Sequence, residues 1–458
     1  MRARIFVLFV AGIAALALIV VARTALYRPA STNAEPSSSL AIPVGAAERL
    51  GGALRIATIS GEDASAFDPA AFQALHAYLE RAFPRVHAQL RRENVASHSL
   101  LYTWQGTDPA LKPILLMGHM DVVPVEPGTE HQWREPPFSG AIADGFIWGR
   151  GAIDNKSAIV GMLEALDMLL GEGFRPARTI FLAYGHDEET GGTNGAREIA
   201  ALLERRGVQL EMVLDEGGVI ADGIFPGIAA PVALIGIAEK GFASVELTTK
   251  MPGGHSSLPP RQSAIGILSA AVARIEANPM PARFEGPTRE FFDRVGAFLP
   301  LPERAVFANL WLTGPLVTRR LQGNPTTNAM VRTTTAATIF QAGTKDNVLP
   351  SRARAVLNFR ISPADSVAAV AEHVRRVTDD PRIEVRIGGA FSAEPSAVSS
   401  TRSRSFRSLE NAVRSVVPGA IVAPYPVVVV TDSRHFAGIS ADIYRLLPVR
   451  LGARELER

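Results

Sequence analysis

The stretch LKPILLMGHMDVVPV, residues 111–125, decides the fold of this chain. Residues 114–117 form a short apolar run after Pro113, a pattern typical of a buried strand. His119 and Asp121 come where that strand is expected to end, and residues two apart in an extended chain point to the same side. An imidazole and a carboxylate placed in this way suit a metal ligand oriented by a neighbouring acid. By itself a His-x-Asp pair at a strand end is more often an ordinary polar loop, so the interpretation depends on other motifs.

Three further acidic motifs follow, namely GRGAIDNKS at 149–157, YGHDEETGG at 184–192 and VLDEGG at 213–218. Asp154 precedes a predicted helix, where a helix cap is the simpler role. Glu188 and Glu189, like Asp215 and Glu216, precede two glycines, where a solvated turn is the simpler interpretation. Taken together, one histidine and several carboxylates at the ends of strands in one sheet would repel one another unless cations are present. Two divalent ions about 3.5–4 Å apart, bridged by one carboxylate, would relieve this repulsion and activate a water.

Helical patterns alternate with apolar strands between residue 46 and about residue 240. The predicted helices are Pro69–Phe83, Lys156–Leu170 and Asn194–Arg206, and the predicted strands are Ile114–Met117, Arg178–Ala183 and Met212–Leu214. This alternation favours an α/β layered fold with a largely parallel sheet. Sites in such sheets form beyond the carboxyl ends of the strands, where three of the four motifs are expected to lie.

A separate α+β module is predicted after residue 240. Its expected strands are 240–250, 331–340 and 353–361, and its expected helix is Ser263–Ala277. After about Ser362 a helix at Val367–Val377 and later strands are expected to return to the first domain, and the polar tract at 395–405 is expected to be a surface loop.

Composition limits the function further. The chain has 458 residues, and 47 Lys and Arg against 45 Asp and Glu give a net charge of +2, which offers no basic field for nucleic acid. The absence of cysteine excludes thiolate catalysis, disulfides and cysteine-bound zinc. Any metal must therefore be held by His, Asp and Glu, which favours hard or borderline divalent ions.

The N-terminus carries an unbroken apolar run, residues 5–22, flanked by Arg2, Arg4 and Arg23. It is long enough to span a bilayer, and no convincing cleavage site follows it before Arg23. We therefore expect an uncleaved signal anchor rather than a cleaved signal peptide, and an exported body in either case, membrane-anchored or secreted. Residues 28–45, rich in Pro, Ser and Ala, are expected to be a linker that holds the body away from the membrane.

The ordered motifs LLMGHMDVVPV, WGRGAIDNKSA, HDEETGG, LDEGG, GGHSS and KDNVLPSRARAVLNFRI resemble metallopeptidase family twenty, which includes acetylornithine deacetylase, aminoacylase, glutamate carboxypeptidase and carboxypeptidase S. The resemblance covers roughly residue 46 to the end. The segments VVPV, LDEGG, 280–330, TDSRHF and YRLLPVR are most similar to carboxypeptidase S and the N-acyl-amino-acid hydrolases.

The resemblance implies a metal-dependent amidohydrolase or carboxypeptidase with two divalent ions, Zn²⁺ or else Co²⁺ or Mn²⁺. It implies that His119 and Asp215 bind one ion, that Glu189 binds the other and that Asp154 bridges them. It further implies that Asp121 orients His119 and that Glu188 is the general base and acid for a metal-activated water. The expected substrates are small peptides or N-acyl amino acids, and hydrolysis and the reverse condensation both stay open.

The family also implies that the inserted module is a lid that forms homodimers, with a histidine reaching the partner's active site. In this chain that histidine is His255, and Asn347, Arg360 and Arg434 are expected to hold the substrate carboxylate. The expected domains are a signal segment (1–27), a linker (28–45), a catalytic domain in two parts (46–240 and 363–458) and the lid (241–362).

The chain departs from the subgroup at its end. There the last ligand of the second ion is a histidine in a His-Gly-x-Asn-Glu-type motif, which follows the segment resembling 444–458. The sequence stops at Arg458, so we expect a truncated gene product with an incomplete second metal site. His435 is the nearest histidine, but it does not match the ligand position. A membrane-tethered, non-catalytic or impaired homologue is therefore the rival hypothesis to a working amidohydrolase.

Overall fold

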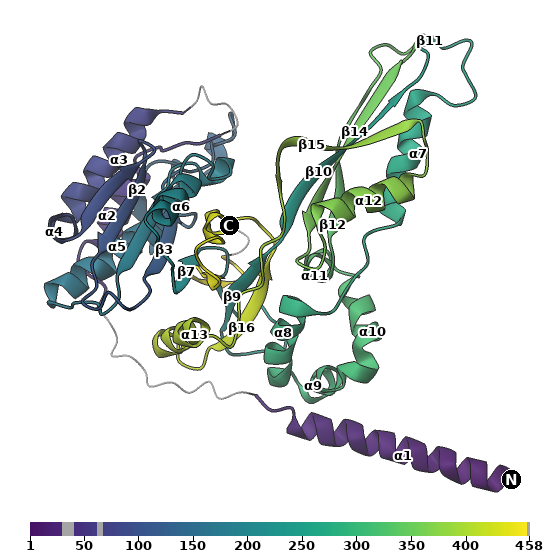
Figure 1. Ribbon diagram of the computed structural model, residues 1–458, viewed down its shortest axis with the longest axis horizontal. Coiled ribbons are helices and arrows are strands. Elements are labelled where there is room, and N and C mark those ends of the chain that lie inside the picture. Colours follow the sequence, from purple (N-terminus) through teal and green to yellow (C-terminus); the bar gives the residue numbers. More distant parts are fainter. Residues whose placement is uncertain (30–40, 62–66, 456–458) are drawn as a thin grey trace.

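The computed structural model describes residues 1–29, 41–61 and 67–455. Among these residues, ten strands form one mixed sheet, and a four-stranded sheet extends away from it (Figure 1). The strand order in the first sheet is β1 (Arg91–Val95), β2 (Ser99–Trp104), β6 (Ile180–Gly185), β3 (Ile114–His119), β7 (Met212–Asp215), β17 (Ile443–Arg445), β9 (Val232–Glu239), β8 (Ile220–Asp222) and β18 (Arg450–Gly452), with β16 (Ile421–Val427) paired to β9.

The three central strands β6, β3 and β7 run parallel. Their register sets His119 opposite Gly185 and Leu116 opposite Leu214. Antiparallel pairs β1–β2, β2–β6 and β8–β9 flank them, which makes the sheet mixed. The carboxyl ends of β3, β6 and β7 therefore meet at one edge of the sheet, where ligand sites of open α/β sheets form.

Side chains that alternate along the strands build a core on each face of this sheet. Leu100 and Tyr102 of β2 pack among helices on one face, whereas Leu101 packs with α6 and η5 on the other. The helices of the first face are α2 (Ala46–Leu54), α3 (Pro69–Ala82), α4 (Pro84–Gln89) and α5 (Lys156–Gly171). The helices of the second face are α6 (Ala196–Arg205) and η5 (Asp432–Phe436). Helix α13 (Arg404–Val416) packs near β16. A hairpin, β4 (Ala141–Ala143) with β5 (Phe146–Trp148), and the short helices η2 (Glu130–Gln132) and η3 (Glu188–Thr190) lie in the connecting loops.

The predicted helices and strands around the acidic motifs are confirmed, with ends shifted by one or a few residues. The helix expected at Lys156–Leu170 is α5, and the strand expected at Met212–Leu214 is β7. The tract 395–405 is irregular up to Ser403, and α13 begins at Arg404.

The second sheet has the strand order β12 (Thr334–Ala342), β14 (Arg352–Ile361), β10 (Gly241–Lys250) and β15 (Ile383–Ala393). Helices α7 (Ala264–Ala277) and α12 (Val367–Thr378) cover it, and the short strands β11 (Gly254–His255) and β13 (Val348–Leu349) pair beside it. Helix α12 and strand β15 belong to this layer, although the sequence assigned residues after 362 to the returning catalytic domain. The physical reason is that β15 pairs with β10 and that Val370 and Val374 of α12 fill the same core.

A helical segment follows α7 and precedes β12, and it joins the two sheets to the N-terminal helix. It comprises α8 (Gly286–Val295), η4 (Gly296–Phe298), α9 (Leu301–Ala308), α10 (Leu310–Leu321) and α11 (Pro325–Val331). The N-terminal helix α1 (Arg2–Leu26) contains an 18-residue window with a mean hydropathy of 3.1 and is long enough to cross a membrane. Its last turns lie against α9 (Figure 1), so the body contacts this helix directly. Residues 30–40 of the expected linker lie outside the described residues.

Candidate metal centre

Four loops bring acidic groups to the carboxyl edge of the central strands. His119 is the last residue of β3, Glu188 and Glu189 follow β6, and Glu216 follows β7. Asp154 lies in the loop before α5, and its peptide bond to Asn155 is cis. The parallel register of β3, β6 and β7 therefore gathers residues that are up to about a hundred positions apart in sequence.

His119, Asp154 and Glu216 form the centre of the site. The Nε2 atom of His119 lies 2.8 Å from Asp154 Oδ1 and 3.2 Å from Glu216 Oε1. One donor atom from each residue lies within 4.8 Å of the other two, a spacing at which one metal ion could contact all three. Asn155 donates a hydrogen bond from its amide to the other oxygen of Glu216, which fixes that carboxylate toward His119.

Asp121 holds His119 together with the loop that carries Glu188, the predicted general base, and Glu189, and this loop is called the catalytic loop below. The Nδ1 atom of His119 lies 3.0 Å from the backbone oxygen of Asp121 and 3.3 Å from its Oδ1. The two carboxylate oxygens of Asp121 also accept hydrogen bonds from the backbone N–H groups of Glu188 and Glu189, at 3.2 and 3.1 Å. One buried carboxylate thus orients the imidazole and positions both glutamates.

The imidazole of His119 faces oxygen acceptors at both ring nitrogens. Burial is the largest influence and lowers its pKa, but the carboxylates of Glu216, Asp121 and Asp154 outweigh burial and raise that pKa well above its ordinary value. The Nε2 atom lies between two carboxylates, a position in which a divalent cation could take the place of a proton. The donor set of one imidazole and two carboxylates therefore fits a metal ion.

Both glutamates of the catalytic loop are held near other negative charges. Burial raises the pKa of Glu188 well above its ordinary value, and Asp432 and Glu216 raise it further. Burial and the charge of Asp154 raise the pKa of Glu189 to about 7. A site in which carboxylates resist ionisation together is one that a cation would stabilise.

Asp432 supports the same conclusion from a distant part of the chain. Its side chain is buried on η5, and neither carboxylate oxygen has a hydrogen-bond partner among the described residues. Burial and the neighbouring charges of Asp215 and Asp121 raise its pKa well above the ordinary value. This buried carboxylate was not singled out from sequence, because only the tertiary fold brings η5 to the site.

The structure places Glu216 in the cluster and Asp215 beside it. Asp215 ends β7 in register with Arg445 of β17, and its Oδ2 accepts a hydrogen bond of 2.9 Å from the backbone N–H of Ser433. Burial, followed by the charge of Glu216, raises the pKa of Asp215 to about 7. The sequence analysis predicted Asp215 as the ligand and did not consider Glu216, the first residue beyond the strand, which lies closer to His119.

The residues expected to bind substrate lie in three places. Arg434 on η5 donates to the backbone oxygen of Gly191 at 2.6 Å, so it adjoins the catalytic loop, and His435 Nε2 lies 3.2 Å from the same oxygen. Arg360 lies on β14 with its guanidinium over the ring of Phe242.

His255 and Asn347 lie together at the β11–β13 pair, where Ser256 donates its backbone N–H to the backbone oxygen of Asn347 at 3.1 Å. That pair lies at the outer end of the second sheet, away from the candidate metal centre (Figure 1).

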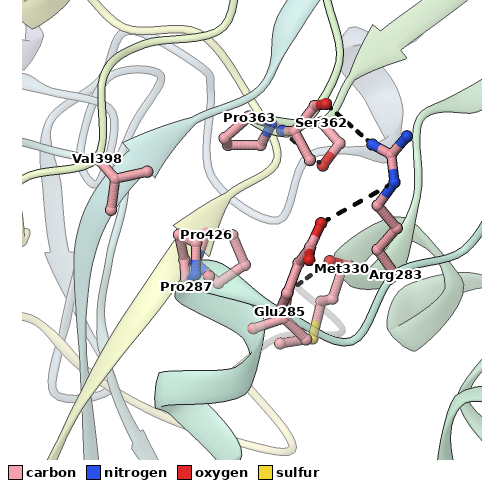
Figure 2. Close-up of a pocket in the computed structure, with 11 residues that line it drawn as sticks. Arg283, Glu285, Pro287, Met330, Ser362, Pro363, Val398 and Pro426 are labelled. Carbon is pink, nitrogen blue, oxygen red and sulfur yellow. Dashed lines mark hydrogen bonds and ion pairs between the residues drawn. The ribbon is translucent and has the colours of Figure 1, made fainter.

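A cavity of about 270 Å³ lies elsewhere, between α8 and the ends of β14 and β16 (Figure 2). Its charged groups already have partners, because Arg283 pairs with Asp365 at 2.8 Å and with Glu285 at 3.9 Å. The rest of its lining is mostly apolar or proline, including Met330, Val398 and Pro426. The cavity thus lacks the cluster of histidine and carboxylate groups found at the carboxyl edge.

Comparisons with known proteins agree with this geometry. Residues 115–453 match the model of the peptidase family M20/M25/M40. The chain is 43% identical over 417 residues to a probable carboxypeptidase S-like 2 of Dictyostelium discoideum, covering 90% of this chain and 79% of that protein. It is 42% identical over 412 residues to the N-fatty-acyl-amino acid synthase/hydrolase PM20D1 of Mus musculus, covering 89% and 81%.

Two solved structures share the fold. An M20 family metallo-carboxypeptidase from Sulfolobus solfataricus superposes with a TM-score of 0.60 at 20% identity, covering 89% of this chain and 92% of that chain. Human carnosine dipeptidase 1 superposes with a TM-score of 0.58 at 17% identity, covering 89% and 90%.

Proposed function

The chain belongs to the peptidase family M20/M25/M40 and is a metal-dependent hydrolase, and from this premise we propose that it cleaves the amide bond of N-acyl amino acids or small peptides. The observation that carries the proposal is the cluster of His119, Asp154 and Glu216 beside the loop that holds Glu188. Peptidases of this family typically use two divalent metal ions.

The donor set in this chain fits such ions. We propose that His119, Asp154 and Glu216 hold the first ion, and that Asp154 and Glu189 contribute to a second. Asp215, which the family resemblance suggested as a ligand, would then support the site through Ser433. Zinc suits one imidazole with carboxylates, and Co²⁺ or Mn²⁺ would also fit this set. When bound, a divalent ion would polarise the amide carbonyl and lower the pKa of a water.

Glu188 is proposed as the general base and then the general acid. Its raised pKa makes its carboxylate a stronger base than that of an ordinary glutamate, so it can take a proton from the attacking water and return it to the leaving amine. Asp121 fixes the backbone of Glu188 and the ring of His119, which keeps both groups in one orientation during the reaction.

Substrate binding is proposed to use cationic side chains. Arg434 adjoins the catalytic loop and carries a guanidinium suited to a carboxylate. His255, with Asn347 beside it, is proposed to reach the active site of a second copy, because both lie at the outer end of the second sheet. Arg360 stays a weaker proposal, since its guanidinium stacks on Phe242.

The names of the relatives suggest a substrate class. Several relatives at about 40% identity are N-fatty-acyl-amino acid synthase/hydrolases, and others are carboxypeptidase S-like proteins. We propose N-acyl amino acids with long apolar acyl chains as the preferred class, with peptides second. We also propose that α1 anchors the body on the exported side of a membrane.

A substrate panel tests this proposal. Full-length protein with added zinc is given N-oleoyl amino acids, N-acetyl amino acids and dipeptides, and release of the free amino acid is measured. We expect turnover that is highest on the long acyl chain and that falls by about 10²–10⁴-fold in Glu188→Gln. The matched control is Glu204→Gln, an exposed glutamate on α6. No turnover on any substrate, or equal turnover in Glu188→Gln, would remove the proposed role.

A further inference from the structure

Helix α10 exposes an apolar face where a soluble protein usually presents polar residues. Trp311, Leu312 and Leu316 are 53%, 49% and 66% exposed, and Leu301 at the start of α9 is 60% exposed. Residues 311, 312, 315 and 316 recur at helical spacing, so they lie on one side of α10. The opposite side is apolar as well, since Leu310 and Val317 are buried. A contiguous exposed apolar face of this kind marks an interaction surface.

The buried residue that precedes α10 also holds the N-terminal helix. Asn309, just before α10, donates its side-chain amide to Thr24 Oγ1 at 3.2 Å and to the backbone oxygen of Val20 at 3.3 Å. Arg23 Nε donates to the backbone oxygen of Ala308 at 3.1 Å, and the hydroxyl of Tyr27 donates to the backbone of α8. Trp311 is thus two residues from a direct contact with the end of α1.

The contact between Asn309 and α1 determines how far the exposed face of α10 lies from the membrane surface. The most apolar window of α1 has none of its surface buried, so in a spanning helix it would face lipid. Arg23 ends that apolar stretch, which puts the membrane surface near Arg23 and therefore near Asn309. Tryptophan favours this interfacial depth, and its neighbours Leu312 and Leu316 favour the layer below it.

Basic residues border the same face. Arg319 and Arg320 are exposed in the last turn of α10, at the C-terminal end of this face. Arginine beside an apolar helix face suits the anionic headgroups of phospholipids. Apolar side chains and cationic side chains are therefore combined as in helices that lie in a membrane surface.

We infer that the face formed by Trp311, Leu312 and Leu316 of α10 inserts into the surface of the bilayer that α1 spans. The inference goes beyond the proposed hydrolysis and rests on α1 remaining attached as the proposed anchor. The body is then held against the lipid at two places, α1 and α10, instead of being suspended on a linker. A lipid surface with anionic headgroups is the partner.

Spin labelling of the full-length protein tests the inference, because the chain has no cysteine and each variant carries one label. Leu316→Cys labels the face, and Leu258→Cys, a leucine that is 84% exposed near β11, is the matched control. In vesicles of phosphatidylcholine and phosphatidylglycerol, power saturation compares collisions with O₂, which concentrates in lipid, and with a water-soluble nickel chelate. We expect the 316 label to meet O₂ more often than nickel and the 258 label to show the reverse order.

Two results would overturn the inference. One is a 316 label with the same water access as the 258 control. The other is dipolar broadening between 316 labels together with low access to both reagents, which would assign the face to a second copy of the chain.

Fluorescence gives an independent readout at a neighbouring residue. The chain has four tryptophans, and lipids brominated in the acyl chain quench only those that approach the bilayer. We expect quenching in the wild-type protein that disappears in Trp311→Phe, and quenching that persists unchanged in that variant would contradict the inference. Neither readout depends on turnover, so its failure and the failure of the proposed hydrolysis are separate results.

Discussion

His119 is fixed through both of its ring nitrogens, and this decides the chemistry of the site. Asp121 contacts Nδ1, while Asp154 and Glu216 face Nε2. An imidazole oriented on one side by a buried carboxylate presents its other nitrogen as a metal ligand. The main difference between the sequence analysis and the structure also concerns single residues. The sequence analysis named Asp215, whereas Glu216 faces Nε2 of His119.

Neutralising each acid separately distinguishes Glu216 from Asp215. Because Glu216 faces His119 directly, Glu216→Gln should weaken zinc binding by more than the roughly 10–100-fold typical of a residue that only supports a ligand. Asp215→Asn should stay within that range, since Asp215 accepts a hydrogen bond from Ser433. Competition with a fluorescent zinc chelator measures both affinities. The opposite order would return the ligand role to Asp215.

The buried acid Asp215 also predicts how stability depends on pH when metal is removed. Burial and Glu216 raise its pKa from 3.8 to about 7 in the folded chain, so the folded state favours the protonated form. Its contribution to stability is complete below the unfolded value of 3.8 and is lost as pH rises toward 7. In a chelator, the free energy of unfolding of the wild type should therefore fall more between about pH 4 and pH 7 than that of Asp215→Asn. Denaturant titrations at several pH values measure both free energies. If the free energy of unfolding fell equally with pH in the two proteins, this assignment would be contradicted.

At the residue scale, sequence predicted that His119 and Asp154 lie together, as the structure shows, but it did not predict that Glu216 and Asp432 lie beside them. Both members of the pair 215–216 are acidic, and the spacing alone does not show where β7 ends and the chain turns. Asp432 joins the site only because η5 packs against the sheet, more than two hundred residues after β7. Neither feature has a local signal.

At the scale of elements, a buried ion pair joins the strands behind the site. Arg445 of β17 donates from Nε to Glu239 of β9 at 2.7 Å, and both side chains are almost fully buried. Glu239 also accepts hydrogen bonds from Thr431, the residue just before η5, and Ser433 of η5 holds Asp215. The pair therefore links two strands of the sheet with the loop that supports the site.

Breaking this pair should be far more costly than breaking an exposed one. Arg445→Leu leaves Glu239 buried without its cation and should lower the free energy of unfolding by about 3–5 kcal/mol. The matched control is Arg450→Leu, whose pair with Asp222 is largely exposed and should cost about 0–1 kcal/mol. Urea denaturation measures both values, and similar losses in the two variants would show that the buried pair is not a stabilising link.

Among elements, long periodic segments were predictable and layer membership was not. The pattern of Val367–Val377 predicts a helix, and α12 is there, but the pattern does not say which sheet it covers. The sheet that α12 covers is set by the pairing of β15 with β10, strands more than a hundred residues apart in sequence. The helices α8 to α11 were not predicted, because Pro315 and several short turns interrupt their periodicity.

At the scale of the whole molecule, the position of His255 predicts an active site shared between two copies. His255 lies at the outer end of the second sheet, so its proposed role requires a partner chain (Figure 1). His255→Ala and Glu188→Gln should each be poorly active, whereas co-expressed mixtures should recover part of the activity, because one site of each mixed dimer has both residues. Turnover of mixed dimers purified through two different tags measures this. Mixed dimers as inactive as the parents would exclude a shared site.

Metal-dependent turnover tests the central claim most directly. The wild-type protein is stripped with a chelator, and hydrolysis of an N-acyl amino acid is followed as zinc is returned. His119→Ala, which removes the imidazole of the cluster, is compared with His131→Ala, which removes an exposed histidine in η2. We predict that the stripped protein is inactive, that zinc restores the wild type and His131→Ala, and that His119→Ala stays inactive. Full turnover after metal removal, or equal restoration of His119→Ala, would contradict a metal-dependent hydrolase centred on this cluster.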